Sequence, residues 1–143
     1  MNHDHYDDDY LADILKNART IALLGASPKP ERPSHGVMRF LLGRGYTVYP
    51  VNPGQAGKEI LGREVFARLG DVPQEIDIVD VFRAPQHLQG IVDQALALPQ
   101  RPRVIWAQLG VRDDAAAARA EAGGIRVVMN RCPAIEYPRL VRR

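Results

Sequence analysis

Short apolar runs of strand length, separated by segments of helical period, are the feature that most restricts the fold of this chain. About five such runs occur, at Thr20 to Leu24, Tyr46 to Val51, Ile76 to Phe82, Arg103 to Leu109 and Arg126 to Met129. Their nearly continuous apolar character indicates strands that are buried on both faces, as in a parallel sheet covered by crossover helices. A weaker strand is expected near Glu64 to Phe66.

The segments between these strands have the spacing of crossover helices. We predict helices over Ser34 to Arg44, Pro85 to Leu98 and Asp113 to Ala122, and a short helix over residues 10–18 after a polar, mobile tail at residues 1–9. The 143 residues suit one domain. Right-handed crossovers then predict a single α/β domain over 1–143, a doubly wound parallel sheet of Rossmann type with strand order 3-2-1-4-5 and helices on both faces.

This topology places a ligand crevice beyond the carboxyl ends of the strands, where the chain reverses direction between the first strand and the fourth. Gly25 and the small Ala26 would let a phosphate approach main-chain N–H groups, and Arg83 is suited to binding phosphate. Trp106 is expected in the core, with Gln108 nearer the crevice. The predicted ligand-binding residues are Gly25, Ala26, Ser27, Lys29, Arg32, His35, Val51, Asn52, Pro53, Phe82, Arg83, Pro85 and Gln108.

Composition and charge exclude several classes of function. Nineteen basic and seventeen acidic residues give a net charge of only +2, which does not favour a nucleic-acid partner. No apolar run approaches the roughly 20 residues that a membrane span needs. The acidic start, without a basic or apolar stretch, does not resemble a secretory signal, and Cys132 is the only cysteine. We expect a cytoplasmic protein.

The sequence does not support two chemical alternatives, a dinucleotide site and a thiol nucleophile. A dinucleotide fingerprint continuing from Gly25 would need glycines where Ser27 and Pro30 stand, and no carboxylate follows the second strand to hold a ribose. Cys132, His35 and Glu136 could form a thiol nucleophile, but nothing in their spacing brings them together. We therefore predict no catalytic residue and no metal site.

Six ordered motifs resemble the small stand-alone CoA-binding protein family, which is similar to the nucleotide domain of the succinyl-CoA synthetase alpha subunit. The resemblance extends from about Thr20 to Tyr137, with Asn130 standing where members often have Asp. The motifs are Gly25-Ala26-Ser27-Pro28, Arg32-Pro33-Ser34-His35, Pro50-Val51-Asn52-Pro53, Asp80-Val81-Phe82-Arg83, Trp106-Ala107-Gln108-Leu109-Gly110 and Asn130-Arg131-Cys132-Pro133.

The resemblance implies coenzyme A in the crevice, with its adenosine and phosphates against the first loop and the 52–53 and 82–83 segments. This chain is too short to contain the synthetase's phosphohistidine domain or its ATP-binding subunits, so the activity is not implied. We expect noncovalent binding of CoA or an acyl-CoA without catalysis. The alternatives are a CoA-linked enzyme completed by a partner subunit, a redox sensor forming a Cys132–CoA mixed disulfide, or an NAD(P)-binding sensor. A protein partner or a homodimer is left open by the sequence.

Overall fold

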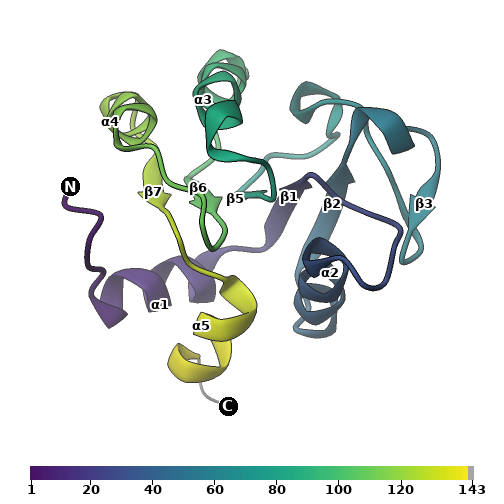
Figure 1. Cartoon of the computed structure of the whole chain (residues 1–143), viewed down its shortest axis with the longest axis horizontal. Coiled ribbons are helices and arrows are strands. Elements are labelled where there is room, and N and C mark those ends of the chain that lie inside the picture. The colour runs from purple at the N-terminus through teal and green to yellow at the C-terminus, as the bar shows by residue number, and fades with distance from the viewer. Residues whose placement is uncertain (142–143) are drawn as a thin grey trace.

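A five-stranded parallel sheet forms the centre of the molecule (Figure 1). The computed structural model describes residues 1–141. The sheet strands, in chain order, are β1 (Thr20–Leu24), β2 (Thr47–Val51), β5 (Ile78–Val81), β6 (Val104–Ala107) and β7 (Arg126–Val128). They lie in the order β2-β1-β5-β6-β7, and every pairing is parallel. The predicted Rossmann-type α/β fold is confirmed.

The expected order 3-2-1-4-5 counts the weak strand near 64–66 as the third strand. The observed order differs only there, at one edge of the sheet. The weak strand predicted near 64–66 is reduced to a single parallel bridge between Val51 and Phe66, so that the five sheet strands run 2-1-3-4-5 in chain order. Glu64 does not join the sheet because β4 (Arg63–Glu64) pairs with β3 (Glu59–Ile60) in a small antiparallel hairpin, and Val65 bonds to Lys58 and Gly57 beside that hairpin. Only Phe66 then reaches β2, through the Phe66 N–H to Pro50 and the Asn52 N–H to Phe66.

Helices cover both faces of the sheet, as the alternating pattern predicted. On one face lie α1 (Asp8–Asn17), α2 (Pro33–Gly43) and α5 (Pro133–Leu140), and on the other lie α3 (Leu88–Ala97) and α4 (Asp114–Ala122) (Figure 1). Short 3-10 turns occur at Pro53–Gln55, Leu69–Asp71 and Pro85–His87. Among residues 1–141, none of the helices has the length and apolar character that crossing a bilayer requires.

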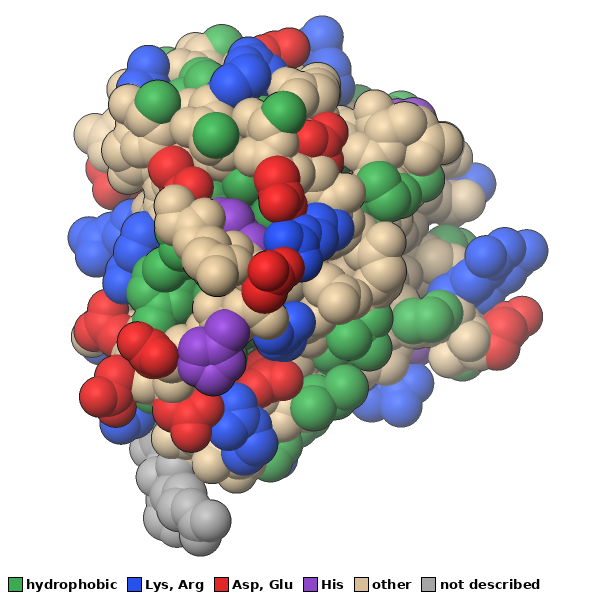
Figure 2. Space-filling model, turned by 60° about the vertical axis from the view of Figure 1, so that its left-hand side comes forward, with side chains coloured by type: hydrophobic (Ala, Val, Ile, Leu, Met, Phe, Trp, Pro, Cys, Tyr) green, Lys and Arg blue, Asp and Glu red, His purple; other side chains and the backbone are tan. Residues whose placement is uncertain are grey.

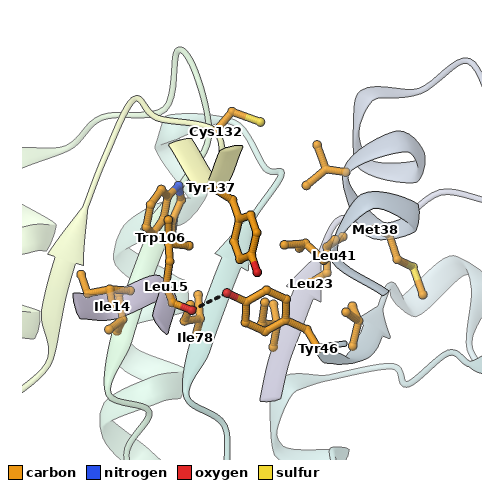
Figure 3. Close-up of a cluster of buried hydrophobic side chains, with 14 of the residues drawn as sticks. Ile14, Leu15, Leu23, Met38, Leu41, Tyr46, Ile78, Trp106, Cys132 and Tyr137 are labelled. Atoms are coloured by element: carbon orange, nitrogen blue, oxygen red, sulfur yellow. Dashed lines mark hydrogen bonds between the residues drawn. The ribbon is translucent and has the colours of Figure 1, made fainter. Parts of the chain in front are cut away.

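Trp106 anchors the core on the face covered by α1, α2 and α5 (Figure 3). Its side chain is fully buried, as predicted, and its indole N–H donates to the carbonyl oxygen of Arg131 at 3.0 Å. The Tyr46 hydroxyl donates to the Leu15 carbonyl, and the Tyr137 ring meets Tyr46 edge to face. The two hydrogen bonds satisfy the polar tips of large aromatic side chains inside an apolar layer. They also connect α1 to the residue before β2, and β6 to the segment before α5.

The amino-terminal segment packs along the exposed edge of β7. We expected residues 1–9 to form a mobile tail, but the side chains of His3 and Tyr6 are buried. The Tyr6 hydroxyl accepts from the Met129 N–H at 2.8 Å, and the Tyr10 hydroxyl donates to the Val127 carbonyl at 3.0 Å. These side chains therefore occupy backbone groups that an edge strand would otherwise leave open to pairing with another chain.

Acidic and basic side chains are interspersed over the face seen in Figure 2. Several basic groups are paired with acids from distant parts of the chain, as in Arg112 with Asp4 at 2.8 Å and Arg126 with Asp13 at 3.0 Å. Such exposed pairs contribute little to stability individually. They do, however, distinguish these arginines from the unpaired cations described next.

Candidate functional site

The turn after β1 brings the first loop directly against the end of β5. Gly25 has φ +85, and a Cβ added there would lie 2.3 Å from the Phe82 carbonyl oxygen and 2.9 Å from the Phe82 carbonyl carbon. A side chain at this position therefore meets both backbone strain and a steric clash. Glycine is required here for the close approach of two main-chain segments, which forms the floor of the crevice.

The main-chain donors that remain open on this loop are not those of the glycine turn. The N–H groups of Gly25 and Ala26 both point to the Val51 carbonyl, at 3.0 and 3.4 Å. Among the described residues, the N–H groups of Ser27 and Ser34 have no acceptor. Ser34 is the second residue of α2, where the helix dipole favours an anion, and the Arg32 side chain makes no capping bond there.

A groove of about 360 Å³ lies along this loop between β1 and α2. Most of the predicted residues of the loop line it, together with Asn52 and Phe82. The lining residues are Gly25, Ala26, Ser27, Pro28, Lys29, Arg32, Pro33, Ser34, Asn52, Gln55 and Phe82. The groove has the position that the topology predicted, beyond the carboxyl ends of neighbouring strands.

Asn52 holds the loop in place and has little capacity left for a ligand. Its Nδ2 donates to the Ala26 carbonyl at 2.8 Å, and its Oδ1 accepts from the Gly54 N–H at 2.9 Å. Both ends of the amide are thus used within the protein. Asn52 lies in the groove, as the sequence predicted, and its side chain bonds to Ala26 of the first loop and to Gly54 of the turn that follows it.

A second groove, of about 290 Å³, adjoins the first at Gly25, which lines both. It contains the predicted residues Val51, Pro53 and Arg83. It also contains polar and charged residues that the sequence did not single out, namely Arg68, Gln86, His87 and Gln94. Nothing local marks these residues, because they reach the site only when the loop before β5 and the helix α3 fold over the sheet end.

Three of the predicted residues line neither groove. His35 is buried on the inner side of α2, with its Nδ1 3.3 Å from Arg39 Nη2. Pro85 begins the 3-10 turn before α3 and is exposed. Gln108 is buried at the end of β6, where its Nε2 donates to Asp80 Oδ1 at 2.6 Å.

The cations around the two grooves are available for an anion. Lys29, Arg32 and Arg83 are exposed, and none of them has an ion-pair or side-chain hydrogen-bond partner within residues 1–141. An arginine fork without an internal partner can bind both oxygens of a phosphate. Three free positive charges therefore border the pair of grooves, together with open N–H donors that include those of Ser27 and Ser34.

Two titratable groups lie buried beneath this crevice. Asp80 has no exposed surface, and burial raises the pKa of its carboxyl to about 7 against the lowering effect of the Gln108 hydrogen bond. Burial also raises the pKa of the Cys132 thiol, which stands at the start of α5. A raised pKa reduces the thiolate fraction, which is the reactive form in disulfide exchange.

The fold and the two grooves have the architecture of a nucleotide-binding α/β domain. Comparison with known families identifies the family within this class. Residues 19–138 match the family model of the CoA binding domain, so the chain belongs to this family, as the motifs predicted. A relative from Bacillus subtilis (strain 168), the uncharacterized protein YneT, is 34% identical over 122 residues, which are 85% of this chain and 87% of that protein.

Solved structures and a longer enzyme subunit extend the comparison. A hypothetical protein from Pyrococcus horikoshii OT3 has TM-score 0.90 and 38% identity and covers 99% of this chain and 97% of its own. A protein from Thermus thermophilus has TM-score 0.89 and 42% identity, with coverages of 94% and 99%. The alpha subunit of Acetate--CoA ligase [ADP-forming] I from Pyrococcus furiosus is 34% identical over 86 residues, 57% of this chain but only 19% of that subunit.

Proposed function

We propose that this protein binds coenzyme A or an acyl-CoA noncovalently across the carboxyl ends of β1 and β5 and has no catalytic activity of its own. The observation that carries the proposal is the group of unpaired cations, Lys29, Arg32 and Arg83, around two grooves that meet at Gly25. CoA is a polyanion with phosphates at both ends of its ribose, and it matches a site with separated positive groups. Membership of the CoA-binding domain family supports this ligand over other nucleotides.

The first groove is suited to the pyrophosphate of CoA. The N–H groups of Ser27 and Ser34 would donate to its oxygens, and Lys29 and Arg32 would balance its charge. Gly25 and Ala26 contribute the shape of the turn, because their own N–H groups bind Val51. The proposed phosphate site thus depends on the start of α2 as much as on the glycine turn.

The second groove is suited to the adenosine and its 3′-phosphate. Pro53, Val51 and Ile91 give it apolar walls, and Arg83 and Arg68 stand beside them. Arg68 lies 3.8 Å from Asp71, whereas Arg83 has no partner among the described residues. We therefore assign Arg83 the main part in binding the 3′-phosphate.

The non-catalytic part of the proposal is supported by the state of the groups that a thiol mechanism would need. Cys132 is buried with a raised pKa, the Glu136 carboxylate is held by Arg139 at 2.6 Å, and the His35 ring lies against Arg39. Because this chain matches only 19% of the Pyrococcus furiosus ligase subunit, the activity of that ligase is not carried over. A role as one component of a larger CoA-dependent enzyme remains the alternative, and copurification with an ATP-binding partner would favour it.

The test is calorimetric and thermal-shift binding with CoA, dephospho-CoA, acetyl-CoA, NAD and NADP. We expect CoA and acetyl-CoA to raise the unfolding midpoint and NAD to leave it unchanged, since a ligand of the native state stabilises it by mass action. Arg83→Ala should weaken CoA binding about 10- to 100-fold, the factor for a charge-assisted hydrogen bond. Stabilisation by NAD or NADP alone, or by no ligand, would overturn the proposal.

Arg103→Ala is the matched control for that variant. Arg103 is also exposed, but it precedes β6, at the amino end of the sheet, and lies 3.6 Å from Asp77. The same loss of positive charge there should leave CoA affinity within about twofold of the original. Equal losses in the two variants would show only a general effect of net charge, contrary to the assigned role of Arg83.

A further inference from the structure

A buried carboxyl group with one unsatisfied oxygen lies under the crevice. Asp80 is the third residue of β5, between Leu23 of β1 and Trp106 of β6 in the sheet register. Its Oδ1 accepts from Gln108 Nε2 at 2.6 Å, and its Oδ2 is buried without a partner among the described residues. Enclosing a carboxyl group with one idle oxygen is costly, and a core position beside tryptophan does not require it.

Gln108 connects Asp80 to the carboxyl end of the sheet. Its N–H donates to the Val81 carbonyl, and the next residue of that strand, Phe82, donates to the Leu24 carbonyl. These bonds place Gln108 at the carboxyl end of the sheet, two strands from the glycine turn. With strands about 4.8 Å apart, that is roughly 10 Å across the sheet.

The hydrogen bond to Asp80 decides which end of the Gln108 amide is free. A carboxylate can only accept, so Gln108 must turn its Nε2 toward it. The Oε1 atom accepts no hydrogen bond from residues 1–141 and, unlike Asp80 Oδ2, is not completely enclosed, although Gln108 as a whole is only 6% exposed. A fixed hydrogen-bond acceptor therefore stands at the carboxyl end of β6, beside the two grooves rather than within them.

We propose that Asp80 is a positioning residue that holds Gln108 so that its Oε1 accepts an amide N–H of the pantetheine arm of CoA. This inference rests on the proposed function and extends it from the nucleotide to the arm. CoA carries secondary amides in that arm, and each presents an N–H donor. An arm that leaves the pyrophosphate site beside Gly25 and runs along the strand ends passes Phe82 and then Gln108.

The state of Asp80 should make this acceptor depend on pH. When the carboxyl is protonated, it can donate to Gln108 Oε1, and the amide is free to turn over and present Nε2 in its place. The groups around Asp80 are Leu23 and Trp106 on the neighbouring strands and the Cys132 thiol at the start of α5, with which it interacts electrostatically. Burial keeps that thiol in its neutral form, so ionisation of Asp80 governs the change.

The test compares CoA with adenosine 3′,5′-bisphosphate, which lacks the pantetheine arm, in calorimetric titrations at pH 6, 7 and 8. The dissociation constant of the bisphosphate divided by that of CoA measures what the arm contributes to binding, and a higher ratio means a larger contribution. Asp80→Leu and Gln108→Leu should each lower this ratio about three- to tenfold, the factor for one neutral hydrogen bond. Both variants should bind the bisphosphate within about twofold of the original protein, as should the exposed control Gln100→Leu.

Asp80→Asn separates the positioning role from a structural one. Asparagine cannot ionise and, like the protonated carboxyl, offers Gln108 both a donor and an acceptor, so the ratio in this variant should be the same at every pH and close to that of the original protein at pH 6. In the original protein the ratio should rise between pH 6 and 8. Ionisation of the ligands changes the ratio equally in the original protein and in Asp80→Asn, so it does not affect the comparison of their pH profiles. Full arm contribution in Asp80→Leu, or the same pH profile in Asp80→Asn and the original protein, would overturn the inference.

Three further results would each have a separate meaning. If Asp80→Leu does not fold, the pH profile of Asp80→Asn decides alone. If neither CoA nor the bisphosphate binds the original protein, the proposed function fails and this inference falls with it. If both ligands bind but the leucine variants match the original protein, only the role of Asp80 is refuted.

Discussion

Substitution of Gly25 by alanine tests how closely the first loop approaches β5. The new Cβ would lie 2.3 Å from the Phe82 carbonyl oxygen, whereas ordinary contact begins at 3.4 Å, so the carbonyl must retreat by about 1 Å. Phe82 cannot retreat freely, because its N–H is bonded to Leu24 at 2.8 Å. Positive φ costs an alanine about 1 kcal/mol and overpacking of this kind about 2 kcal/mol, which together predict a loss of about 3 kcal/mol.

Gly45→Ala supplies the matched control, and urea unfolding followed by circular dichroism supplies the measurement. Gly45 has a similar φ of +92, but an added Cβ meets nothing within 4 Å. It should therefore lose only the conformational part, about 1 kcal/mol. If the two variants lose the same free energy of unfolding, within about 0.5 kcal/mol, the close approach at Gly25 does not have the steric cost deduced from it.

Three further changes have definite expectations. Tyr6→Phe leaves the Met129 N–H without its acceptor and should cost about 1–3 kcal/mol in urea unfolding, while amide exchange at Met129 accelerates; unchanged exchange would contradict the packing of the amino-terminal segment along β7. Asn52→Ala removes the bond to Ala26 that holds the first loop and the bond from Gly54 that holds the following turn, and it should weaken CoA binding about tenfold with a smaller loss of stability, as calorimetry and urea unfolding would show together. For Asp80, a folded pKa of about 7 above the unfolded value of 3.8 means that the native state holds the proton longer, so the free energy of unfolding falls as pH rises from about 4 to 7. Asp80→Asn should remove this decline, and parallel pH profiles in the two proteins would refute it.

The strands, the crossover helices and the place of the crevice could be predicted from the sequence because each depends on local pattern. Apolar runs of strand length and helical spacing are properties of neighbouring residues, and handedness then limits the topology. The helix α5 was not predicted, since it spans eight residues with Pro133 at its start and Pro138 within it. Tertiary contacts, such as those of Tyr137 in the core, override this weak propensity.

The chemistry of the site was predicted only in part, because hydrogen-bond partners depend on which distant segments become neighbours. The sequence identified Gly25, Lys29, Arg32 and Arg83 by residue type and position after a strand. It could not show that Val51, far along the chain, occupies the N–H groups of the glycine turn, or that both ends of the Asn52 amide are bonded within the protein.

The sequence by itself thus determined the fold class, the family and the end of the sheet where the two grooves lie. Only the tertiary structure decided which donors and charges remain free there. It also brought Arg68 to the second groove and enclosed Asp80 beneath Gln108. The physical reason is that local pattern specifies what a segment becomes, whereas burial and pairing, which set the state of each polar group, arise from contacts between segments remote in sequence.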